Sequence, residues 1–163
     1  YRLLGSLQTG TTFKLQVEVQ KQSYLYVLNA NATQNKSVVL FPQDSVSALI
    51  GARSVVWLPT NHTSKSFTLI PPTGTEYLLF LFSEKPLDIN FLVRRMNFQS
   101  GTFVEKIYQT FGESMIPTEE LRYKEKKVGF FLTGEHRGSI APLLLSFDHT
   151  KKAEGPVRRT PLP

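Results

Sequence analysis

The chain has 163 residues, of which 40% are hydrophobic and 20% are charged, so it is long enough to bury a core of its own. It contains no cysteine, which excludes disulfide bonds and thiolate metal sites. The formal net charge is +6, and residues 91–163 carry 12 basic against 8 acidic residues, or +4 of that total. No apolar run approaches the ~20 residues of a membrane span. No signal peptide is present and the chain begins at Tyr1, so we expect an excised or processed fragment.

Short strands are predicted through the first half of the chain. Residues 13–20 alternate apolar and polar side chains without interruption, which indicates a strand buried on one side. Residues 23–28 and 37–41 are rich in β-branched and aromatic residues and flank an Asn-rich loop, so they predict a hairpin that ends at Pro42. Further strands are predicted at 53–58, 66–70, 75–82 and 88–93, and the one at 75–82 is apolar on both faces, as a central strand would be.

The pattern becomes helical after Met96. Thr102 and Glu105 have the spacing of a capping box, and the apolar stripe that follows them predicts a helix over 102–111 with Gly112 at its end. A charged connector at 118–127 has room for one helical turn.

Two last strands, 128–133 and 139–147, are predicted to form a hairpin through a glycine-flanked turn. Pro142 inside the second of them indicates an edge or a bulge.

Together these elements predict a mainly β protein, an antiparallel β-sandwich of immunoglobulin-like or similar form, with one short helix near 102–111. We expect residues 1–150 to form a single domain. Residues 151–163 combine Pro, Lys and Arg without apolar periodicity, which is typical of a basic tail or linker.

No residue pattern in the chain predicts catalysis, a metal or a cofactor. His62, His136 and His149 lack metal-ligand spacing and are expected to be solvated loop histidines. Asp148 and His149 could supply two members of a hydrolytic triad, but no Gly-x-Ser-x-Gly elbow accompanies them. Three Asn-x-Ser/Thr triplets begin at Asn31, Asn35 and Asn61, and we interpret them only as markers of polar surface loops.

The basic residues are the candidates for partner binding. Open β-faces can bind nucleic acid through exposed aromatic residues over a positive groove, but a solvated basic surface is the simpler interpretation. The aromatic residues Tyr24, Tyr26, Phe41 and Trp57 are expected in the core instead. The candidate contact residues are Arg94, Arg95, Arg122, Lys124, Lys126 and Lys127, with the two arginines following the predicted strand at 88–93.

Five motifs follow one another along the chain: SYLYVLN at 23–29, VVLFP at 38–42, WLP at 57–59, FTLIPPTGTE at 67–76 and LLFLFSEKPLD at 78–88. Their order resembles a family of bacterial domains of unknown function, over about residues 10–97. Members of that family are attached to caspase-like peptidases, protein kinases and envelope proteins. The family has no established catalytic residues, so the resemblance implies an accessory role. An Asn-rich loop replaces the family's glycine turn, and residues 98–163 lie outside the resemblance.

The sequence therefore predicts a non-catalytic binding module of a larger bacterial protein, in the periplasm or envelope rather than the cytoplasm. We expect it to engage a protein partner through loops or a sheet edge. Binding of nucleic acid or polysaccharide through the basic C-terminal half is the alternative.

Overall fold

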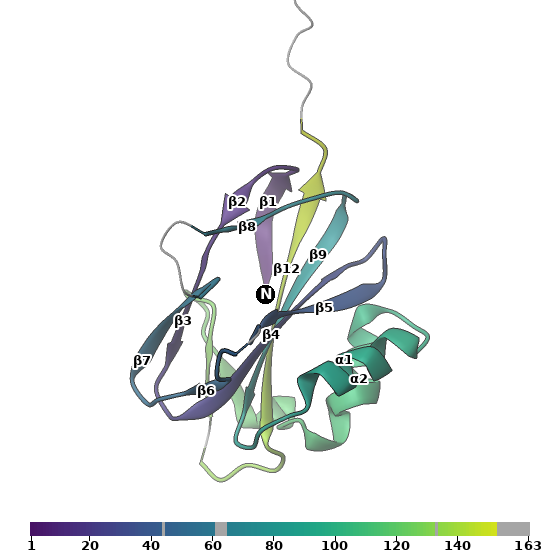
Figure 1. Ribbon diagram of the computed structural model, residues 1–163. Coiled ribbons are helices and arrows are strands. Elements are labelled where there is room, and N and C mark those ends of the chain that lie inside the picture. The colour runs from purple at the N-terminus through teal and green to yellow at the C-terminus, as the bar shows by residue number, and fades with distance from the viewer. Residues whose placement is uncertain (44, 61–64, 133, 153–163) are drawn as a thin grey trace, which may run out of the picture.

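A computed structural model describes residues 1–43, 45–60, 65–132 and 134–152, and it confirms the mainly β, sandwich-like architecture. The central sheet has the strand order β1-β12-β9-β4-β5, and β6 also pairs with β4 (Figure 1). All of its strand pairs are antiparallel except β1 with β12. The strands are β1 (Arg2–Gln8), β4 (Ser23–Asn31), β5 (Lys36–Phe41), β6 (Leu49–Ile50), β9 (Gly74–Ser83) and β12 (Ile140–Thr150).

A second layer, made of two separate strand pairs, covers one face of this sheet. One half pairs β3 (Leu15–Val19) with β7 (Ser54–Leu58), and we call it the β3–β7 ribbon. The other half pairs β2 (Thr12–Phe13) with β8 (Phe67–Thr68). Alternate side chains of the β3–β7 ribbon point inward and form one apolar core with the central sheet, as period-two patterning requires.

Two helices cover the opposite face of the sheet (Figure 1). They are α1 (Ile89–Phe98) and α2 (Phe103–Phe111), and α2 has the predicted capping box of Thr102 and Glu105. Since both faces of the sheet are covered, β9 is apolar on both sides, and the prediction that 75–82 is a central strand is confirmed. None of the helices in the described ranges is long and apolar enough to span a membrane.

The predicted strand at 88–93 was wrong, because these residues begin α1. Asp88 caps the helix by accepting a hydrogen bond from the backbone N–H of Phe91 at 3.1 Å. Ile89, Val93 and Met96 recur at helical spacing and are buried against the sheet. The β-branched and aromatic residues of this segment favour a strand locally, and burial of the helical stripe overrides that preference.

The predicted terminal hairpin was also wrong. β11 (Phe130–Leu132) pairs with β10 (Leu121–Tyr123), whereas β12 lies between β1 and β9 in the central sheet. The short strand β1 was not predicted at all, because residues 2–8 lack clear alternation. Short 3₁₀ helices lie at Gly112–Ser114 and Thr118–Glu120, the second within the connector where a helical turn was expected.

Pro142 lies in the half of β12 that β1 does not reach, because β1 pairs with β12 only from Ser146 onward. The register between the two strands shifts between Arg2 and Ser6. A proline therefore removes no hydrogen bond to β1 at that position, in line with the predicted edge.

Candidate functional site

Three neighbouring strands of the central sheet become polar at the same end. On the face that packs against the second layer, β4 ends with Asn29 and Asn31, β9 begins near Glu76, and β12 ends near His149. Asn31 lies directly opposite Glu76 in the register, and the other two are within reach along the diagonals. The sheet thus gathers a carboxyl group, an imidazole and two amides on one face.

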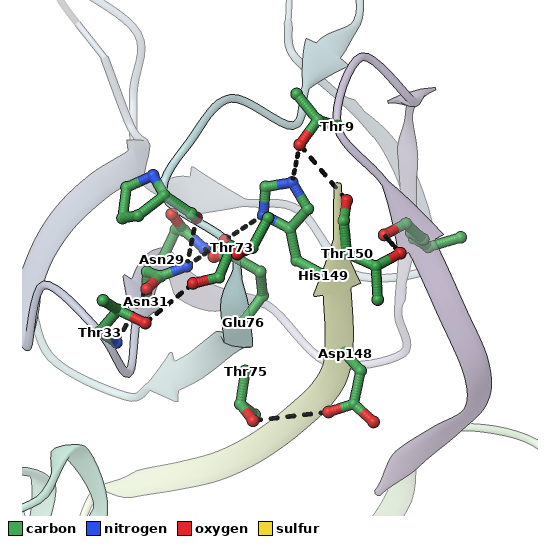
Figure 2. A network of polar contacts seen from close by, with 12 residues as sticks. Thr9, Asn29, Asn31, Thr33, Thr73, Thr75, Glu76, Asp148, His149 and Thr150 are labelled. Atoms are coloured by element: carbon green, nitrogen blue, oxygen red, sulfur yellow. Dashed lines mark hydrogen bonds and ion pairs between the residues drawn. The ribbon is translucent and has the colours of Figure 1, made fainter. Parts of the chain in front are cut away.

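Glu76 is the centre of these contacts (Figure 2). Its Oε1 accepts a 2.6 Å hydrogen bond from Asn31 Nδ2 and lies 3.1 Å from His149 Nδ1. Its Oε2 accepts a 3.1 Å hydrogen bond from Asn29 Nδ2. The side chains of His149 and Glu76 are 0% and 6% exposed, so a carboxyl group is buried here with three polar partners. Such partners offset the cost of removing a carboxylate from water.

Thr9 completes the group, which we call the Glu76 cluster: Thr9, Asn29, Asn31, Glu76 and His149. The Thr9 hydroxyl lies 2.9 Å from His149 Nε2 and 3.3 Å from the carbonyl of Thr150. When His149 is neutral with its proton on Nδ1, the hydroxyl donates to Nε2. When the imidazole is protonated, Nε2 donates to the hydroxyl, which turns to the Thr150 carbonyl. Every imidazole nitrogen therefore has a partner in either state.

The order hydroxyl, imidazole, carboxyl is the order found in a hydrolytic triad. However, the imidazole is fully enclosed, and each side chain of the cluster is hydrogen-bonded to another part of the chain (Figure 2). The Glu76 cluster joins β4, β9, β12 and the turn after β1, so we assign it a structural role.

One prediction about His149 was therefore wrong, and the pairing with Asp148 that the sequence left open does not form. His149 is not a solvated loop residue, because it lies in β12 and is 3% exposed. Asp148 is not its partner, because successive residues of a strand point to opposite faces. The Asp148 carboxylate instead pairs with Arg2 at 2.8 Å and accepts a 3.5 Å hydrogen bond from Thr75.

The prediction that Asn31 belongs to a surface loop was also wrong, because Asn31 is buried in β4. Asn31 is 5% exposed, and its amide also donates a 3.0 Å hydrogen bond to the carbonyl of Pro72. Its Oδ1 accepts from the backbone N–H of Thr33. The Thr33 hydroxyl in turn donates to the carbonyl of Thr73 at 2.8 Å, which ties the β4–β5 turn to the loop before β9. Asn35 does lie in that turn, and Asn61 falls outside the described residues.

Of the remaining histidines, only His136 lies in the described ranges. His136 Nε2 contacts Glu84 Oε1 at 3.0 Å, and His62 falls outside the described residues. Across the described ranges, no three His, Asp or Glu side chains are grouped as metal ligands would be. Hydrogen bonds from the backbone and side chain of Arg137 lower the pKa of the Glu120 carboxyl group.

An open depression of about 260 Å³ lies beside β12, lined by Tyr1, Tyr123 and Leu144. Burial, with smaller contributions from Tyr108 and Tyr1, raises the pKa of Tyr123. The Tyr123 hydroxyl donates to the carbonyl of Pro142 at 3.2 Å, and this hydrogen bond holds the ring in place.

The six basic candidates lie on two separate parts of the fold. Arg94 and Arg95 are exposed on α1 instead of following a strand. Arg122 lies in β10, and Lys124, Lys126 and Lys127 follow it, with the Lys124 ammonium 4.5 Å from the ring centre of Phe131.

Trp57 is the main departure from the predicted core. Tyr26 and Phe41 are each 2% exposed, as expected of core residues, but Trp57 is 55% exposed. It lies on the outer face of the β3–β7 ribbon with Val55, which is 52% exposed. In β7 the alternate residues Val56 and Leu58 point inward, so the alternation places Trp57 on the solvent side.

The first half of the chain matches a known family. Residues 6–86 match the model of a family described as a domain of unknown function, DUF4384. This part of the chain is similar to the DUF4384 family. The match confirms the resemblance found on the sequence motifs. No curated protein and no solved structure matches the chain.

The DUF4384 match ends at residue 86, before both helices and before β12. The matched segment includes four members of the Glu76 cluster, namely Thr9, Asn29, Asn31 and Glu76, but it does not include His149. The cluster therefore joins the DUF4384 segment to a strand contributed by the later part of the chain.

In the sequence, His149 stands out only as a histidine beside Asp148 and Glu76 only as the last residue of the motif at 67–76, and no local pattern joins the two. The available signal was a polar residue at one end of each of three otherwise apolar strands. This signal can be interpreted only once it is known that β12 pairs with β9, and the paired residues are 57 to 75 positions apart in the chain.

Proposed function

We propose that this chain is a non-catalytic accessory module of a larger protein, and that it binds a protein partner through the outer face of the β3–β7 ribbon. The observation that carries the proposal is the exposure of Trp57, the single tryptophan of the chain, on a paired strand. Tryptophan is enriched among the residues that contribute most to protein–protein binding.

The side chains on the outer face of the β3–β7 ribbon have the composition of a protein-binding surface. Val55 and Trp57 lie opposite Glu18 and Gln16 of β3, so two apolar side chains are bordered by two polar ones. An apolar centre with a polar border is the usual composition of a protein interface. Because Trp57 belongs to a paired strand, little conformational freedom is lost when a partner covers it.

The ribbon also supports strand addition. Within the described residues, β3 and β7 pair with each other alone, so each has a second edge without a strand partner. An unpaired edge offers backbone donors and acceptors to an extended segment of another protein. This is the sheet-edge binding predicted from the sequence.

Binding of nucleic acid through the basic C-terminal half is the weaker alternative. Its candidate residues are divided between α1 and the segment around β10, and one of them, Lys124, already lies over the Phe131 ring. Nucleic-acid binding generally uses a continuous series of cationic side chains along one face.

Photocrosslinking tests the proposal. A benzophenone amino acid is placed at position 57 in one variant and at position 128 in a control, since Trp57 and Val128 are both 55% exposed. Each variant is expressed in the organism that makes the chain and is irradiated. We expect a discrete protein adduct at position 57 that is absent at position 128.

The same adducts at both positions, or none at position 57, would contradict the proposal. Treatment with nuclease before electrophoresis identifies an adduct that contains nucleic acid, and such an adduct at position 57 would also contradict it.

A further inference from the structure

The outward face of α1 carries an ordered set of side chains. Phe91, Arg94, Arg95 and Phe98 are spaced by three and four residues, which places them on one side of a helix. We call this set the α1 face. Phe91 is 53% exposed and Phe98 is 91% exposed, and both arginines are also exposed. The buried residues of α1 lie on the opposite side, so packing against the sheet does not account for these four.

The two arginines of the α1 face have no partner within the described ranges. No ion pair or hydrogen bond joins either guanidinium to another described residue, whereas Arg2 and Arg137 are both paired with carboxylates. The sequence of α1, INFLVRRMNF, contains no acidic residue. The α1 face therefore presents two positive side chains, with the exposed ring of Phe91 about one helical turn before them and that of Phe98 about one turn after them.

The number of charges decides which acidic partner fits. Membrane recognition by basic clusters uses about four to eight Lys or Arg side chains. Nucleic-acid sites commonly neutralise on the order of six to ten phosphates. The α1 face has two arginines, which suit two carboxylates, because each guanidinium can hold one carboxylate with two parallel hydrogen bonds. The aromatic rings then provide apolar contacts on either side.

We propose that the α1 face binds an acidic segment of a partner protein, in which two carboxylates contact Arg94 and Arg95 and apolar side chains cover Phe91 and Phe98. This surface is separate from the β3–β7 ribbon, and the inference does not depend on the function proposed for that ribbon. A partner could occupy one surface while the other remains free.

Selection from a displayed library of random 16-residue peptides tests this inference. The intact chain is the target, and enriched peptides are measured against three proteins: the unaltered chain, Arg94→Glu/Arg95→Glu, and the charge-matched control Arg122→Glu/Lys127→Glu. We expect enriched peptides with at least two acidic residues near apolar ones. Their Kd should rise by about tenfold or more in Arg94→Glu/Arg95→Glu, because two charge-assisted contacts are lost. It should change by less than about twofold in the control.

Equal losses in the two charge variants would overturn the inference, because they would indicate attraction by net charge alone. Selection of peptides without acidic residues, or of none that require the α1 face, would also overturn it. Vesicles with anionic lipids and a single-stranded oligonucleotide are tested in parallel. If Arg94→Glu/Arg95→Glu weakens binding to the vesicles or to the oligonucleotide more than it weakens binding to the peptides, the α1 face binds a different class of partner and the inference is overturned. Urea midpoints of all variants check that each protein is folded.

Discussion

Glu76 and His149 lie on neighbouring strands of the central sheet, and the 3.1 Å contact between Glu76 Oε1 and His149 Nδ1 is closed off from solvent (Figure 2). The two residues are 73 positions apart in the chain. Their contact can form only when β12 has paired with β9, so it marks completed assembly of the sheet.

Replacement of Glu76 should therefore weaken the fold. In Glu76→Ala the donors of Asn29, Asn31 and His149 lose a common acceptor, and we expect the free energy of unfolding to fall by about 3–5 kcal/mol. Glu76→Gln keeps the size of the side chain but places an amide N–H group among the amide donors of Asn29 and Asn31. We therefore expect a loss in the free energy of unfolding smaller than that of Glu76→Ala. Urea denaturation measures both.

Glu113→Ala is the control for Glu76→Ala, because Glu113 is exposed and should change stability by less than about 0.5 kcal/mol. Equal effects at positions 76 and 113 would show that the Glu76 cluster does not stabilise the sheet.

Asn97 covers the outer edge of β5 and supports a second prediction. Its Oδ1 accepts a 2.8 Å hydrogen bond from the Ser37 N–H, and its Nδ2 donates a 2.9 Å hydrogen bond to the Ser37 carbonyl. Asn97→Ala leaves both backbone groups unpaired, and we expect a loss of about 1–3 kcal/mol together with increased self-association through the edge. Urea denaturation and light scattering measure these two effects.

Asn90→Ala provides the matched control, since Asn90 is an exposed asparagine of the same helix and the change in helix propensity is the same. If Asn97→Ala proves no less stable than Asn90→Ala, the side chain of Asn97 does not protect the edge.

The capping box of α2 gives a prediction about pH. Hydrogen bonds from the backbone and side chain of Thr102 lower the pKa of Glu105 below its ordinary value. A lowered pKa in the folded state means that the stabilisation is present above the unfolded pKa and is lost as the pH falls through the folded pKa. Carboxyl ¹³C NMR titration should therefore find a Glu105 pKa below that of a glutamate in an unstructured peptide.

Thr102→Ala removes the hydroxyl that donates to the Glu105 carboxylate and accepts from the Glu105 backbone N–H, and it should move the Glu105 pKa toward the ordinary value. An unchanged Glu105 titration in Thr102→Ala would rule out the capping box as the cause of the shift.

Local patterns were enough to predict much of this fold. The capping box at Thr102 and Glu105, the hairpin of β4 and β5, and the central position of β9 all depend on residues close together in sequence. Each of these signals has a local physical cause, either a cap, a turn or an unbroken apolar run.

The errors have non-local causes. Residues 88–93 favour a strand by composition but form a helix because Ile89, Val93 and Met96 are buried against the sheet. The terminal hairpin was mispredicted because β12 pairs with β1 and β9, which lie far away in sequence. The exposure of Trp57 was missed because a tryptophan in a strand is usually buried, and its face depends on which side of β7 meets the core.

Fluorine NMR of Trp57 tests the central claim most directly. The chain has one tryptophan, so labelling with 5-fluorotryptophan gives a single resonance that reports on the outer face of the β3–β7 ribbon. When the protein crosslinked at position 57 is added in purified form, we predict that this resonance shifts or broadens in proportion to the bound fraction. Binding that calorimetry detects while the resonance stays unchanged would contradict the claim that the partner covers the ribbon.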